Sequence, residues 1–266
     1  MGGVIRVWNI TKTEFIKLKR CNIIWAGIAL MFLSVLLTLF TSIANDGSVW
    51  DFSYLIEQVI KNNMSTIFPM CITLIAGYII ASEKKNDTLK NILTIPISFK
   101  QMLLSKVIIC GLISVFLGII CTIFTIISEI IIGFPGFSLQ LSIQALFQIS
   151  LVNLFLYISV LPIIIITSFS SNGFLVGVIV AFVYGYGGMF ASGNMTLSNL
   201  YPITASLGLI QYRSYDPAVN WNIPICIFSI GIMLLISVII INSAKNPEGI
   251  KVASKKSSKQ IRKKGW

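Results

Sequence analysis

The sequence predicts an all-α integral membrane protein with six transmembrane helices, and three observations support this. Between Val107 and Tyr212 the only charged side chain is Glu129, and residues 21–45 and 62–82 carry none. A charge at the centre of a bilayer costs about 2.5–3.5 kcal/mol, whereas a water-facing surface needs charges. Hydrophobic residues make up 56% and charged residues 11%, against about 25% charged in soluble domains. Six apolar windows are long enough to cross a hydrocarbon core of about 30 Å.

The six windows run in order along a single membrane domain that covers residues 1–266. They are residues 22–43, 62–82, 107–128, 143–168, 173–192 and 222–243. The fourth and fifth are separated only by Ser168–Asn172, which predicts a helical hairpin with a short polar turn. A chain of 266 residues leaves no room for an additional soluble catalytic domain.

The basic residues are distributed unequally between the two sides of the membrane. With six spans, both termini share one side with residues 83–106, and 18 of the 20 Lys and Arg residues lie there. The other side has only Lys61 and Arg213, and its acidic residues are Asp46, Asp51, Glu57, Glu129 and Asp216. Cytoplasmic loops carry the excess of basic residues, so both termini are expected in the cytoplasm.

Residues 4–20 form the first predicted element, an amphipathic helix before the first span. Trp8, Thr11, Phe15 and Leu18 recur at spacings that place them on one helix face, with cations away from it. Such a helix lies in the membrane interface with its apolar face down. The alternative is a charged flank that only orients the first span. The basic tail, residues 245–266, is expected to lie against anionic headgroups.

Residues 83–106, between the second and third spans, contain a short amphipathic helix. Leu89, Ile92 and Leu93 share one face of it, and Pro96 ends it because the residue before a proline avoids the α region. The apolar face has no core of its own in the cytosol, so it is expected to dock onto another protein or onto lipid headgroups.

A second helix is predicted to restart after this corner and to run into the third span. Ser98 and Gln101 form a Ser-x-x-Gln capping box, in which the serine side chain caps the new helix. Residues 83–106 therefore read as a short helix, a sharp corner and the start of a long helix.

Polar and small residues in the fourth and fifth spans allow two interpretations, a substrate path or helix packing. The polar residues at the start of the fourth span and deeper within it are Gln140, Gln144, Gln148 and Asn153. Gly173 and Gly177 form a GxxxG pattern, which lets helices approach closely. Residues 193–221 are rich in Pro and Tyr and suit short interfacial or re-entrant helices at the outer surface.

Several kinds of chemistry are absent from the sequence. There is no histidine, which excludes histidine-ligated zinc and histidine-based catalysis, and no metal site is expected. There is no GxxxxGK[ST] motif for ATP. The five cysteines show no CxxC pairing and read as reduced structural thiols. The basic tail lacks interleaved aromatic residues, so nucleic acid is not an expected partner despite the net charge of +11.

The 83–106 segment resembles the intracellular loop of type-2 ABC-transporter permeases. The matching residues are Glu83, Thr88-Leu89, Ile92-Leu93, Pro96-Ile97-Ser98 and Lys106. The departures are Asp87 where the family often has Gly, Phe99-Lys100 where it often has Arg, and Ser105 where it often has Gly.

This resemblance implies a transport subunit without its own nucleotide site. The resemblance also implies a separate ABC ATPase, present in two copies, that binds ATP and Mg²⁺. The helix that couples this chain to the ATPase is implied to include Glu83, Thr88, Leu89, Ile92, Leu93, Pro96 and Ser98. A second permease, identical or homologous, is also implied, with a substrate path between the two lined from spans two and five. This chain itself is expected to bind no cofactor.

The chain is also similar to the small six-span permeases of bacitracin-resistance and lantibiotic self-protection exporters. The shared features are its length, the Glu14-x-x-Lys17-Leu18-Lys19-Arg20 run and Phe68-Pro69. This similarity implies a bacterial cytoplasmic membrane and an amphipathic antimicrobial peptide or lipid-like substrate. The alternatives are a membrane-embedded lipid-modifying enzyme, with Glu83, Asp87 and Glu129 as its candidate acids, and a non-transporting sensor or scaffold subunit.

Overall fold

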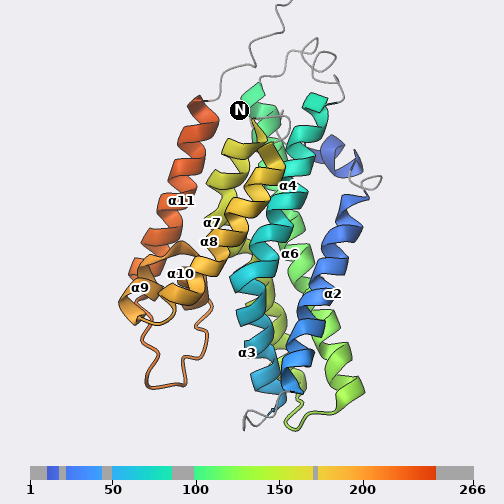
Figure 1. Cartoon of the computed structure of the whole chain (residues 1–266), viewed down its shortest axis with the longest axis vertical. Helices are drawn as coiled ribbons and strands as arrows, with labels where there is room; N and C mark the ends of the chain where they lie inside the picture. Colours follow the sequence, from blue (N-terminus) through green and yellow to red (C-terminus); the bar gives the residue numbers. More distant parts are fainter. Residues whose placement is uncertain (1–10, 18–21, 44–49, 86–98, 170–172, 244–266) are drawn as a thin grey trace, which may run out of the picture.

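The computed structural model describes residues 11–17, 22–43, 50–85, 99–169 and 173–243, with residues 82–85 described by their backbone alone. All regular structure within these ranges is helical (Figure 1). After a helical segment at residues 11–17, the elements are α2 (Ile23–Ser42), α3 (Phe52–Asn62), the π-helix η1 (Asn63–Ile67), α4 (Phe68–Lys85), α6 (Phe99–Ile132), α7 (Leu139–Ser168), α8 (Gly173–Ala191), α9 (Met195–Leu200), α10 (Pro202–Leu209) and α11 (Ile223–Ser243).

Six stretches of these helices are long and apolar enough to cross a bilayer, which confirms the predicted all-helical, six-span class. They are Ile23–Ser42, Phe52–Ala81, Phe99–Ile132, Leu139–Ser168, Gly173–Ala191 and Ile223–Ser243. The second and third extend beyond the apolar windows, because helical hydrogen bonding continues past Lys61 and Lys106, where hydropathy falls. With 34 residues, α6 is about 50 Å long at a rise of about 1.5 Å per residue, so its ends reach beyond the hydrocarbon core.

The bundle has two distinct ends. Residues 11–17, the C-terminal turn of α4, the N-terminal turn of α6 and the end of α11 lie together at the upper end in Figure 1. We call this the basic end, because Lys12, Lys17, Lys100 and Lys106 lie in these elements. The α6–α7 turn lies at the opposite end, and α9 and α10 lie on the same half of the bundle (Figure 1).

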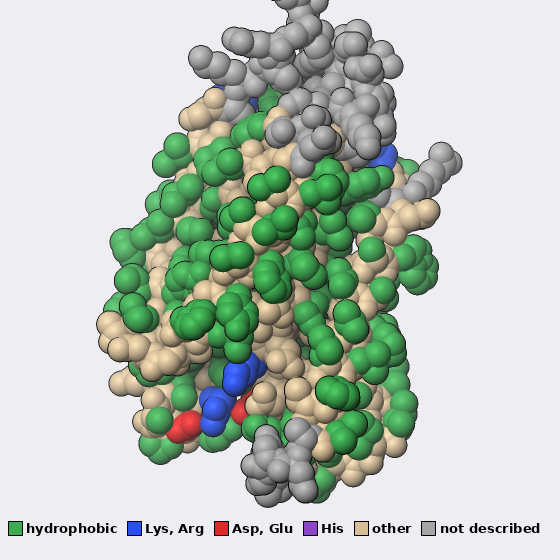
Figure 2. All heavy atoms as spheres, viewed as in Figure 1, with side chains coloured by type: hydrophobic (Ala, Val, Ile, Leu, Met, Phe, Trp, Pro, Cys, Tyr) green, Lys and Arg blue, Asp and Glu red, His purple; other side chains and the backbone are tan. Residues whose placement is uncertain are grey.

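The centre of the bundle is formed by the α3–η1–α4 helix and by α7. Phe68 and Ile72 of α4 and Leu156 and Ile164 of α7 are fully buried. By contrast, α2, α8 and α11 each bury a narrow stripe and expose large apolar side chains elsewhere. Figure 2 shows hydrophobic side chains spread over the middle of the visible face, with the charged side chains near its two ends, as expected of helices that contact lipid.

The π-helix η1 precedes Pro69, in the first turn of α4, and this junction receives α8. Proline has no backbone N–H, so the carbonyl of Ser65 loses the donor that a regular α-helix would supply. Gly185 of α8 packs directly over the Ser65 carbonyl. A Cβ added at Gly185 would lie 2.7 Å from the oxygen of this carbonyl. The buried face of α8 is built from small residues, which allows this close helix approach.

Candidate functional site

The predicted coupling loop is bracketed by two helices at the basic end. α4 ends at Lys85 and α6 begins at Phe99, so the chain leaves and re-enters the bundle at the same end (Figure 1). Glu83 lies in the last turn of α4. The other coupling residues lie outside the described residues: Thr88, Leu89, Ile92, Leu93, Pro96 and Ser98.

A buried ion pair joins residues 11–17 to the base of this loop. Lys106, near the start of α6, is 2% exposed, and its Nζ donates to Glu14 Oε2 at 3.1 Å. The same ammonium donates to the carbonyl of Ile79 in α4 at 3.0 Å. Glu14, which is 7% exposed, also accepts a hydrogen bond from Lys17. One ammonium group therefore ties together the N-terminal helix and both helices that frame the loop.

Glu14 and Lys106 stabilise each other's charge. Either charge buried without its partner would be unfavourable, because it loses its hydration at this depth. Burial alone would raise the pKa of the Glu14 carboxyl, but the positive charges of Lys106 and Lys17 hold this pKa below its ordinary 4.5. The carboxylate is therefore ionised at neutral pH. Both residues stand out in the sequence, yet 92 positions separate them, and no local pattern links them.

The predicted interfacial helix is described only in part. Within residues 11–17, Thr11 is buried and Phe15 is 53% exposed. These two residues were expected on one apolar face, but Thr11 and Glu14 together form the side that contacts the protein. Trp8 and Leu18 lie outside the described residues.

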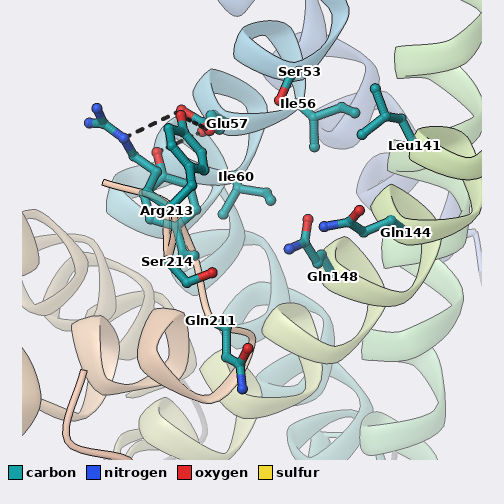
Figure 3. A pocket seen from close by; sticks show the side chains of 12 residues that line it. Ser53, Ile56, Glu57, Ile60, Leu141, Gln144, Gln148, Gln211, Arg213 and Ser214 are labelled. Carbon is teal, nitrogen blue, oxygen red and sulfur yellow. Dashed lines mark hydrogen bonds and ion pairs between the residues drawn. The ribbon is translucent and has the colours of Figure 1, made fainter. Parts of the chain in front are cut away.

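At the opposite end, Gln144 and Gln148 of α7 line a cavity of about 200 Å³. Figure 3 shows both amides directed into the space in front of Ile60, and Gln148 Nε2 donates to the carbonyl of Ile210 at 3.5 Å. Leu141 of α7 also lines this cavity. The remaining walls come from α3 and from the segment after α10, and comprise Ser53, Ile56, Glu57, Ile60, Gln211, Tyr212, Arg213, Ser214 and Tyr215.

A polar network centred on Glu57 closes one wall of this cavity. The Tyr215 hydroxyl donates to Glu57 Oε1 at 2.5 Å, and Arg213 Nε lies 3.5 Å from Glu57 Oε2 (Figure 3). Arg213 Nη2 also lies 3.1 Å from Asp216 Oδ2. The hydrogen bond to Glu57, together with burial, raises the pKa of the Tyr215 hydroxyl above its ordinary value.

The backbone that carries Arg213 adopts an unfavourable conformation. Gln211 and Arg213 have φ values of 54° and 51°, in the left-handed region, which costs about 1–3 kcal/mol for a residue with a side chain. Three contacts hold the turn: the Tyr215 hydrogen bond, Tyr212 Oη donating to the Glu57 carbonyl at 3.2 Å, and Trp221 Nε1 donating to the Tyr212 carbonyl at 2.7 Å. The sequence has no glycine or asparagine at these positions, so it gives no sign of this geometry.

The structure places Asn153 and Gly177 away from the cavity. Asn153 is fully buried and accepts a hydrogen bond from Asn63 Nδ2 of the π-helix at 2.7 Å. A Cβ at Gly177 would lie 2.3 Å from Thr167 Oγ1, which shows how closely α8 approaches α7. These contacts favour helix packing for both residues. Gly173 is the first residue of α8 and is half-buried.

The described residues contain no group of three or more His, Cys, Asp and Glu that could hold a metal ion. Four of the cysteines are buried thiols. Two of the acids considered for a lipid-modifying enzyme lie at opposite ends of the bundle, since Glu83 lies in the last turn of α4 at the basic end and Glu129 lies near the far end of α6.

A comparison with families of known proteins gives a match over residues 10–188 to the family described as ABC-2 family transporter protein. The match includes Glu14, Lys106, the predicted coupling loop and the α3 and α7 walls of the cavity. It ends before the segment that carries Arg213. The search of curated individual proteins returned no match.

Proposed function

This chain belongs to the ABC-2 family of transporter membrane proteins, and on that premise we propose that it is the permease of an ATP-driven exporter. The observation that carries the proposal is the family match across a chain whose sequence contains a coupling-loop pattern but no ATP-binding loop. The ATPase, with its ATP and Mg²⁺, is then a separate chain that binds residues 83–106.

The proposed orientation places the basic end in the cytoplasm of a bacterium, with both termini on that side. The bias of basic residues supports this, because it follows the rule for inner loops. A tag at the C-terminus should be inaccessible to a membrane-impermeant label in intact cells. Labelling there would contradict the orientation and would place the coupling loop out of reach of a cytosolic ATPase.

The proposed assembly contains two ATPase subunits and a second permease, identical or homologous. Support comes from α8, which exposes a broad apolar face that includes Val183 and Phe190. Of the two helices implied to line a substrate path, α8 is therefore accessible to a partner. Most of α4 is buried, although Tyr78 is 42% exposed and provides one point of access.

The proposed substrate is an amphipathic antimicrobial peptide or a lipid-like molecule, moved outward or cleared from the membrane. The similarity to bacitracin-resistance and lantibiotic self-protection permeases supports this class. The cavity of Gln144 and Gln148 is also amphipathic, because its polar amides lie beside Ile56, Ile60 and Leu141. Such a lining suits a ligand with both polar and apolar parts.

Co-purification tests the proposed function. The tagged chain, extracted from its native membrane in mild detergent, should retain a polypeptide with an ABC ATPase motif and should hydrolyse ATP only when that polypeptide is present. Isolation of the intact chain without any ATPase from native membranes, or ATP hydrolysis by the chain alone, would overturn the proposal.

A further inference from the structure

The only two basic residues outside the basic segments lie in one cavity. Lys61 and Arg213 are distant in the sequence and are the two exceptions to the bias of basic residues. Both line a cavity of about 200 Å³ that shares Tyr212 and Arg213 with the glutamine-lined cavity. On the face shown in Figure 2, the basic and acidic side chains of the lower end gather in one place. We propose that this cavity binds an anionic amphiphile, a lipid or lipid-like molecule with a phosphate headgroup.

One part of the wall of this cavity suits an apolar chain. It contains three methionines and further apolar side chains from the π-helix, α8, α9, α10 and the following segment: Met64, Met189, Met195, Leu207, Val219 and Trp221. Met64 and Leu207 are 2% and 5% exposed and form the buried part of this wall. Methionine side chains are flexible and polarisable, and therefore adapt to apolar ligands of varied shape.

Most other polar groups of the wall are already used within the protein. Ser192 Oγ donates to the Met189 carbonyl at 2.7 Å, and Ser198 Oγ donates to the Ala191 carbonyl at 2.9 Å. Trp221 Nε1 donates to the Tyr212 carbonyl. Lys61 is therefore the charged group best able to recognise a ligand, and Arg213, which is paired with Glu57 and Asp216, adds a second cation to the same lining.

The charge that faces this cavity is positive. Its lining, taken from the described part of the chain, contains Lys61 and Arg213 but no carboxylate. The Lys61 side chain has no ion-pair partner among the described residues. Arg213 is held from behind by Glu57 and Asp216, which do not line this cavity. A phosphate headgroup in this cavity can form charge-assisted hydrogen bonds with cations of its lining.

Two independent costs converge on this site. A cation on the translocated side of the membrane opposes the bias that orients the protein, and Arg213 also occupies a left-handed backbone conformation. Unfavourable conformations of this kind concentrate at functional positions. Because the cavity lies toward the end opposite the basic end, the headgroup would come from the outer leaflet.

Binding at this cavity requires no ATPase and can be tested independently of the proposed transport. The role of this site in substrate selection rests on the exporter function proposed above. In such an exporter, the cations of the cavity select anionic lipid-like substrates over cationic peptides.

Fluorescence of Trp221 gives a direct test, because this indole lines the cavity. The full chain, with the other four tryptophans (Trp8, Trp25, Trp50 and Trp266) replaced by Phe, is placed in phosphatidylcholine nanodiscs. Brominated phosphatidylglycerol or brominated phosphatidylcholine then replaces part of the lipid, and bromine quenches the nearby indole. Phosphatidylglycerol should quench Trp221 at a severalfold lower mole fraction than phosphatidylcholine. Lys61→Gln should weaken this preference about fivefold, the factor expected for one cation at an anionic surface, whereas Lys61→Arg should retain it.

Three results would overturn the proposal: equal quenching by the two lipids, a preference unchanged in Lys61→Gln, or a preference lost equally in Lys61→Arg. Millimolar glycerol phosphate distinguishes the source of the anion. Loss of the preference in its presence would assign the site to a soluble phosphate and contradict an amphiphile. Co-purification with an ATPase is a separate readout, so failure of either proposal can be recognised without the other.

Discussion

The two ends of the bundle each hold a carboxylate–cation pair that joins distant parts of the chain, but only one of these pairs is sealed. At the basic end, Lys106 and Glu14 are 2% and 7% exposed. At the opposite end, the Arg213 side chain is 41% exposed and lines two cavities. A sealed pair cannot reach a ligand and can only fix the positions of its helices. An open pair can fix a turn and still present its cation to a ligand.

The sealed pair should give the largest effect when it is broken. Lys106→Ala leaves the Glu14 carboxylate buried without its main partner, and breaking a buried pair in this way costs about 3–5 kcal/mol. Thermal unfolding in detergent, together with limited proteolysis near residues 11–17, should show a strong loss of stability and release of this helix.

The double variant Glu14→Gln with Lys106→Met is the matched control. It removes both charges while keeping similar side-chain volumes, and replacing a whole buried pair is often close to neutral. If Lys106→Ala were as stable as the wild type, or no less stable than the double variant, the pair would not have the structural role assigned to it.

The open pair should give a smaller effect. Glu57→Gln keeps a hydrogen-bond acceptor for Tyr215 but removes the charge that faces Arg213, which should cost about 1–2 kcal/mol in thermal unfolding. Asp216→Asn removes a more exposed partner of Arg213 and should cost less than about 1 kcal/mol. An Asp216 variant more damaging than the Glu57 variant would show that the turn is held from the outside instead.

Acidification should weaken the sealed pair and should have a smaller effect on stability than the substitutions above. The pKa of Glu14 is held below 4.5, so the ionised carboxylate stabilises the protein above pH 4.5 and this contribution is lost as the pH falls through the lowered pKa. The difference in melting temperature between wild type and Glu14→Gln should be constant near neutral pH and shrink below pH 4.5. A difference that grew on acidification would contradict this sign.

The six-span class could be predicted because the bilayer excludes charge, and this exclusion is visible in composition alone. The ends of the helices were harder to predict, because Lys61 and Lys106 lower the local hydropathy without ending the helices. The meeting of Glu14 with Lys106 could not be read from the sequence, because tertiary packing decides contacts across 92 residues. Lys61 and Arg213 did leave a signal, as the two cations outside the basic segments of the sequence, but only the structure shows that they share a cavity.

The permease is proposed to engage an ATPase through residues 83–106, and the variant Leu93→Asp tests this engagement. Leu89 and Leu93 are predicted to lie one helical turn apart and to face the ATPase. Burial of one leucine contributes about 1.5–3 kcal/mol, and a carboxylate in its place must also be desolvated.

The expected loss of about 3–5 kcal/mol corresponds to roughly 10²- to 10³-fold weaker association. In a pull-down from native membranes, Leu93→Asp should insert and express normally but lose the ATPase and transport. Lys90→Ala, predicted to point away from this face, should retain both. Retention of the ATPase and full transport by Leu93→Asp would contradict the claim that this loop is the coupling element.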